Sequence, residues 1–180
     1  MPSGRVTHAE SGGVHVLRYF GRVNYVLAPA IKQFADDLVD QGDVRGWVFD
    51  LTHAEILDST NLGLLARLAV RAGSGGQDTS TRSVIVSTSD DINSVLRSMS
   101  FDQIFEIVTA PVAVGTVPIP TPAPDAEEDI GGALPSRREL GETMLDAHRA
   151  LMALSETGRL QFQQVVAALE AELSDDRDES

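Results

Sequence analysis

Hydrophobic residues along this sequence follow two spacings, one typical of strands and the other typical of helices. Residues 14–23 alternate apolar and polar side chains, which predicts a strand. Apolar residues that recur three and four positions apart, as in residues 31–39, predict helices. On these grounds we expect strands at 14–21, 46–51, 83–88 and 104–108, and helices within 26–43, 60–72 and 90–100.

The order of these elements predicts the fold class. Residues 46–51 and 83–88 contain nearly uninterrupted apolar runs, which are typical of central strands buried on both faces. Strands alternate with helices, so we expect an α/β domain with a mainly parallel or mixed sheet packed by helices. The first helix has Pro29 in its first turn and Gly42 beyond its end, and Asp90 or Asp91 is expected to cap the third.

A different pattern begins after the fourth strand. We assign residues 1–110 to one domain and residues 111–135 to an extended linker, because this stretch holds six of the eight prolines and lacks apolar periodicity. Residues 136–173 return to helical spacing, and Gly158 divides them into two helices. Residues 174–180 form an acidic tail. Such a helical pair cannot bury its apolar stripe alone, so it must dock on the domain, on a second copy of the chain or on a partner.

Composition narrows the classes of function. The net charge is −13, divided as −4 over residues 1–110 and −9 over residues 125–180, which argues against nucleic acid and anionic membranes as partners. The absence of cysteine excludes disulfides and thiolate metal sites. The first residues lack an export signal, and no apolar run is long enough to span a bilayer, so we expect a cytoplasmic protein whose partners are proteins.

The junction between residues 46–51 and the next helix carries a polar cluster, Asp58-Ser59-Thr60-Asn61. Side-chain oxygens of these types accept hydrogen bonds from free N–H groups at a helix start, so the cluster is explained by capping alone. A helical projection places Leu64, Arg67 and Arg71 together on the side away from the sheet. An apolar residue between two arginines beside exposed hydroxyls indicates a protein-binding surface.

The segment "VFDLTHAEILDSTNLGLLARL" resembles the signature of STAS domains, specifically those of bacterial anti-sigma-factor antagonists. Gly21 after a strand and the closing "INSVLRSMSFDQIFEIV" are similar to the same family, so the resemblance covers about residues 5–110. It implies that Ser59 is phosphorylated by an anti-sigma factor that is also a serine kinase, and that a serine phosphatase restores binding. Asn61 and Ser100 replace glycines that are usual in the family.

The helical projection and the resemblance together predict a partner surface that includes Asp58, Thr60, Asn61, Leu64, Arg67 and Arg71. Asn24 and Tyr25, in the loop after Gly21, are either a second strip of this surface or an ordinary loop. Thr60 is the alternative phosphate acceptor, although its position favours capping. The second interpretation is a STAS module that never switches and serves as a structural subunit of a transporter or signalling assembly. A third is a domain that binds or hydrolyses a nucleotide weakly.

Catalysis finds no support in the sequence. The four histidines lack metal-ligand spacing, and the glycine run at residues 73–76 lacks the Gly-Lys-Ser/Thr end of a P-loop, so we interpret it as a flexible loop. We therefore expect no metal, no cofactor and no enzyme activity, and a protein that acts as a substrate and a ligand. The C-terminal helices are open to self-association.

Overall fold

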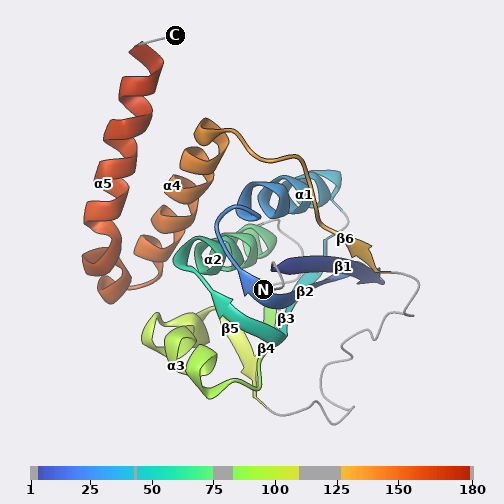
Figure 1. Ribbon diagram of the computed structural model, residues 1–180. Coiled ribbons are helices and arrows are strands. Elements are labelled where there is room, and N and C mark those ends of the chain that lie inside the picture. The colour runs from blue at the N-terminus through green and yellow to red at the C-terminus, as the bar shows by residue number, and fades with distance from the viewer. Residues whose placement is uncertain (1–3, 43, 75–82, 110–126, 179–180) are drawn as a thin grey trace.

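A six-stranded mixed sheet lies at the centre of the computed structural model, which describes residues 4–42, 44–74, 83–109 and 127–178. The strand order is β5-β4-β3-β2-β1-β6 (Figure 1). The strands are β1 (Arg5–Ser11), β2 (Val14–Val23), β3 (Gly46–Leu57), β4 (Ser83–Val86), β5 (Phe105–Val108) and β6 (Glu128–Asp129). The helices are α1 (Ala28–Gln41), α2 (Ser59–Ser74), α3 (Asp90–Ser98), the 3₁₀ turn η1 (Phe101–Gln103), α4 (Arg137–Leu154) and α5 (Glu156–Asp178).

The pairing of the strands confirms the predicted α/β class and mixed sheet. β2, β3, β4 and β5 pair in parallel, whereas β1 pairs antiparallel with both β2 and β6. Helices connect the parallel neighbours, because a parallel pair needs a long crossover. The sequence pattern missed β1 and β6, and it ended β2 two residues and β3 six residues too early.

The two faces of the sheet differ in what covers them. Side chains of β2 and β3 such as Leu17, Trp47 and Phe49 face the main core, where residues of α1, α2 and α3 pack against them. The opposite face carries a small valine cluster that includes Val16 and Val48. Alternate residues of each strand therefore point to opposite faces, as the geometry of a strand requires.

Local signals set the helix boundaries. Pro29 lies in the first turn of α1, and Gly42 ends that helix in the left-handed conformation with φ +82°, as predicted. The cap of α3 was predicted wrongly: Ser89, not Asp90 or Asp91, accepts the N–H of Ile92. Both aspartates lie instead in the first turn, where their negative charge interacts favourably with the positive end of the helix dipole.

The C-terminal region forms two helices that stack outward from the domain. A capping box of Ser136 and Glu139 starts α4, and the break falls at Ser155, so Gly158 lies in the first turn of α5. α4 packs on α2 and α5 packs on α4, which leaves α5 farthest from the sheet (Figure 1). Of the three docking sites considered for this pair, the structure shows the domain itself.

The end of the segment expected as a linker belongs to the folded unit. Glu128–Asp129 adds β6 to the edge of β1, and Ile130 joins the main core. Glu127 binds Arg18 and accepts a hydrogen bond from Thr7. The rest of the expected linker up to residue 126 and most of the glycine-rich loop, residues 75–82, lie outside the described residues.

Candidate functional site

The polar cluster lies where β3 ends and α2 begins, and Asp58 is its capping residue. Asp58 Oδ1 accepts hydrogen bonds from the backbone N of Asn61 at 3.0 Å and from Asn61 Nδ2 at 2.9 Å. Asn61 is fully buried. Its side chain reaches back to the cap, which gives a structural role to the residue that replaces a glycine usual in the family.

Ser59 is left free of capping and hydrogen-bonds to the C-terminal region. Its Oγ lies 3.0 Å from Nε2 of His148 on α4. The other ring nitrogen, Nδ1, lies 2.7 Å from the carbonyl oxygen of Met144. A carbonyl oxygen only accepts, so in the neutral ring Nδ1 carries the proton, Nε2 accepts, and Ser59 donates. Ser59 is half-buried, whereas Thr60 is only 2% exposed.

Helix α4 covers the N-terminal half of α2 at close range. A Cβ placed on Gly63 would lie 2.2 Å from the carbonyl oxygen of Ala147, so the backbones of the two helices touch at this point. Ala147 and Leu151 of α4 are buried in the main core. Sequence reasoning missed both Gly63 and His148, because nothing in the local pattern links positions 89 residues apart.

The prediction that one face of α2 points outward, away from the domain, is wrong. Leu64 is fully buried, because the stripe that it shares with Arg67 and Arg71 faces α1 rather than solvent. Arg67 forms two hydrogen bonds with the carboxylate of Asp36, at 2.6 and 3.0 Å. Arg71 binds the same carboxylate and also Asp40 at 3.0 Å. Both arginines are thus engaged within the domain.

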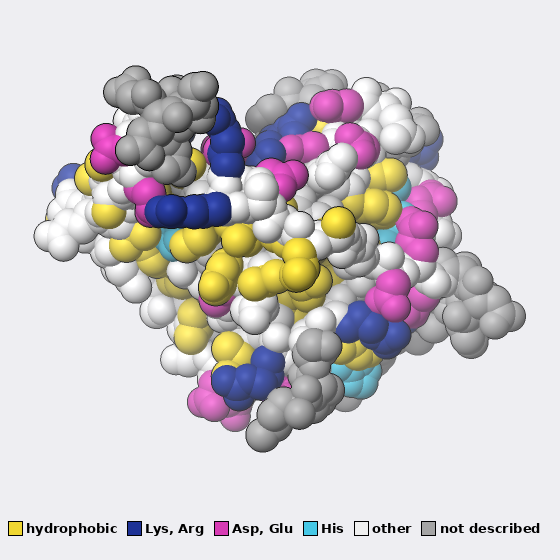
Figure 2. All heavy atoms as spheres, turned by 45° about the horizontal axis from the view of Figure 1, so that its top comes forward, with side chains coloured by type: hydrophobic (Ala, Val, Ile, Leu, Met, Phe, Trp, Pro, Cys, Tyr) yellow, Lys and Arg dark blue, Asp and Glu magenta, His cyan; other side chains and the backbone are white. Residues whose placement is uncertain are grey.

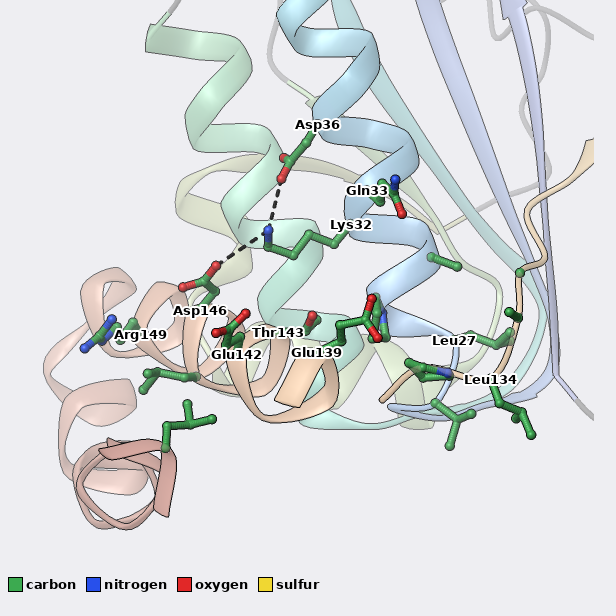
Figure 3. A pocket seen from close by; sticks show the side chains of 18 of the residues that line it. Leu27, Lys32, Gln33, Asp36, Leu134, Glu139, Glu142, Thr143, Asp146 and Arg149 are labelled. Carbon is green, nitrogen blue, oxygen red and sulfur yellow. Dashed lines mark hydrogen bonds and ion pairs between the residues drawn. The ribbon is translucent and has the colours of Figure 1, made fainter. Parts of the chain in front are cut away.

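Asp36 is the centre of this ion-pair network. Its carboxylate also accepts from Lys32 Nζ at 3.2 Å, and Lys32 lies 3.7 Å from Asp146 of α4, so the network joins α1, α2 and α4 (Figure 3). Partial burial acts to raise the pKa of Asp36, but the hydrogen bonds and charges of Arg67 and Lys32 outweigh it and lower the pKa below its usual 3.8.

Two other predicted partner residues remain open to solvent. Asn24 and Tyr25 follow the end of β2, and Tyr25 is 44% exposed. Val23 pairs with Leu57, the residue before Asp58, so the register places this loop beside the start of α2. The exposed part of the predicted surface is therefore this loop.

A groove of about 1040 Å³ runs between α1, residues 132–135, α4 and α5. Its apolar lining includes Leu27, Leu134 and Leu173, and acidic side chains such as Glu142 and Asp146 lie along it (Figure 3). In the space-filling view, hydrophobic side chains gather near the middle of the face and charged groups surround them (Figure 2). Ser59 does not line this groove.

The described residues contain no group of three or more histidine, cysteine or acidic residues placed to hold a metal ion. His8 and His15 pair with each other at 3.0 Å, and His8 also contacts Glu128. His53 is exposed and stacks on Phe20.

Among the helices of the described residues, none combines the length and the apolar character that a membrane-spanning helix needs.

Comparison with known proteins identifies the family. The sequence model of the STAS domain family matches residues 5–112 of this chain. Similar solved structures include unphosphorylated SpoIIAA, an anti-sigma factor antagonist: 16% identity, 52% of this chain and 81% of that one, TM-score 0.45. Phosphorylated SpoIIAA from Bacillus is 15% identical, and the match covers 58% of this chain and 91% of that one with a TM-score of 0.48. An anti-sigma factor antagonist from Mycobacterium paratuberculosis is 22% identical, and the match covers 60% of this chain and 87% of that one with a TM-score of 0.49. Curated protein sequences yield no match.

Proposed function

Because the chain belongs to the STAS domain family, we propose that it is a phosphorylation-controlled protein-binding switch in which Ser59 is the switch residue. One observation supports this most directly. Asp58 makes the capping bonds, so Ser59 at the helix start keeps a hydroxyl that the helix itself does not require. The partner in this proposal is an anti-sigma factor that is also a serine kinase, and it binds the unphosphorylated form.

The chemistry of the switch is phosphoryl transfer from ATP. Ser59 Oγ attacks the γ-phosphorus and forms the Oγ–P bond, while the bond from that phosphorus to the β–γ bridging oxygen breaks and releases ADP. The hydroxyl proton passes to a base of the kinase. A serine phosphatase reverses the change by hydrolysis. The protein itself is the substrate and catalyses neither step.

The position of Ser59 determines what a phosphate changes. Free N–H groups and the positive dipole end of α2 favour an anion at the helix start, so the fold tolerates the modification. The surface changes instead, because a charge of about −1.5 to −2 appears beside the carboxylate of Asp58. A partner that contacts this surface must then desolvate the phosphate or lose the contact. Thr60 is a poorer acceptor because it is buried.

A second function is favoured by the contact between Ser59 and His148. A serine hydrogen-bonded to a buried histidine under α4 is also what a STAS module that never switches would show. In that case the domain is a structural subunit of a larger assembly, and the Asp58 cluster is a helix cap alone.

Mass spectrometry and paired variants separate the two functions. Phosphate is mapped on the chain purified from its own cells, and an ATPase-like partner is recovered with Ser59→Ala and with Ser59→Asp. Ser94→Asp is the matched control, since Ser94 is an exposed serine on α3. The switch predicts phosphate on Ser59, and partner recovery that is lost only with Ser59→Asp. Absence of phosphate in every growth condition, with equal recovery from all variants, contradicts it.

A further inference from the structure

One stripe of α4 is buried, made of Thr143, Ala147, His148 and Leu151, and within it Ala147 and His148 contact α2 directly. This stripe meets α2 where Gly63 has no side chain, so the two backbones approach more closely than any larger residue would allow. The same stripe carries His148, whose Nε2 forms the hydrogen bond with Ser59 Oγ. The contact is therefore specific in both shape and hydrogen bonding.

We infer that the Ser59–Gly63 face of α2 is a helix-binding surface, that α4 is its occupant within the chain, and that α4 shields Ser59 until it detaches. The regulatory meaning of this inference rests on the proposed function of Ser59. A partner that takes the place of α4 presents a helix with a small residue opposite Gly63 and a hydrogen-bonding group opposite Ser59. α4 and such a partner then compete for one surface.

Shielding follows from the geometry around the hydroxyl. Nε2 of His148 occupies the direction in which Ser59 donates, at 3.0 Å, and His148 is buried. Phosphoryl transfer requires the γ-phosphate in line with the attacking oxygen. A kinase active site encloses Ser59 in that geometry only after α4 has moved away.

The attachment of α4 to the domain combines the buried residues Ala147 and Leu151 with a partly exposed ion pair. Its charged link to the domain, Lys32 with Asp146, is partly exposed, and partly exposed pairs contribute little to stability. The chain that leads into α4 passes through exposed residues at 131–134, where Leu134 is 89% exposed. α5 packs against α4, and the His148 and Phe162 rings lie 5.3 Å apart. The two helices can therefore leave α2 as one unit.

A single thiol measures this shielding without any kinase or partner. The chain has no cysteine, so Ser59→Cys in the full chain gives one thiol near the position of Oγ. Its rate of reaction with a maleimide reports how often position 59 is uncovered. Gly63→Ala is then added. Alanine suits the α2 helix better than glycine does, but its methyl group collides with the backbone of Ala147.

We expect Gly63→Ala to speed the reaction by about ten- to a hundredfold, because overpacking weakens the contact between α2 and α4. Gly141→Ala is the matched control, because it makes the same exchange on α4, where the atoms nearest to the new Cβ belong to the flexible side chain of Leu173, at 3.0 Å or more. It should leave the rate unchanged. His148→Ala is a second route to the same effect, since it removes the buried ring that covers position 59 without adding bulk.

Hydrogen exchange on the same variants checks folding. The expected result is loss of protection across α4 with full protection in β2, β3 and β4. Equal thiol rates in the Gly63→Ala, His148→Ala and Gly141→Ala backgrounds, with these strands still protected, would overturn the inference. This failure differs from failure of the proposed function, which shows as absence of phosphate on Ser59 in cells whatever the thiol rates are.

Discussion

Replacing Asp58 tests whether its carboxylate organises the start of α2. Asp58→Ala removes the acceptor for the backbone N of Asn61, a cap loss that costs about 0.5–2 kcal/mol. It also removes the acceptor for Asn61 Nδ2, and an unsatisfied buried donor costs about 1–3 kcal/mol. We therefore expect Asp58→Ala to lower the free energy of unfolding by roughly 2–4 kcal/mol.

Asp58→Asn is the matched variant, because it retains an oxygen that accepts both bonds and loses only the charge near the helix dipole. That loss costs about 0.3–1 kcal/mol. Urea unfolding followed through the fluorescence of Trp47, the single buried tryptophan, measures both variants. Equal destabilisation by alanine and asparagine would refute the argument that these hydrogen bonds, rather than the charge, hold the junction.

Two further predictions concern the parts of the chain that pack on the domain. Ile130→Ala should lower the free energy of unfolding by about 2 kcal/mol or more, because Ile130 is buried. Leu134→Ala should change it by less than about 0.5 kcal/mol, because Leu134 is exposed. Similar values for both variants would contradict the role of residues 127–130 in the fold. The lowered pKa of Asp36 means that its carboxylate stabilises the fold fully above pH 3.8 and loses this effect as pH falls through the lowered pKa. Urea unfolding at about pH 7 and about pH 3 should show the gap between the parent and Asp36→Asn shrinking in acid, and a constant gap would contradict this.

Local signals predicted most of the domain because each of them acts within a few residues. Pro29 and Gly42 determine the ends of α1, and the apolar runs of β3 and β4 give central strands. β1 was not predicted because two buried polar residues, Thr7 and His8, interrupt its apolar pattern. β6 is a two-residue strand, and its pairing with β1 across more than a hundred positions leaves no periodic signal.

The local structure around Ser59 was predicted in part for the same reason. The helix start at Asp58 and Ser59 is visible in the sequence, since capping residues and the strand before them are adjacent. The exposure of Leu64 was predicted wrongly because the helical projection tested a single buried face. α2 in fact contacts the sheet, α1 and α4, and only tertiary structure shows the last two contacts.

Phosphoserine incorporated at position 59 of the full chain, followed by hydrogen exchange, tests the account most directly. α4 serves here as a partner that is always present, so a phosphate that disrupts helix binding at this surface must also release α4. The account predicts faster exchange of the amides around Ala147 and His148, with unchanged protection in β2, β3 and β4. Protection of α4 that stays equal to that of the unmodified chain would contradict it.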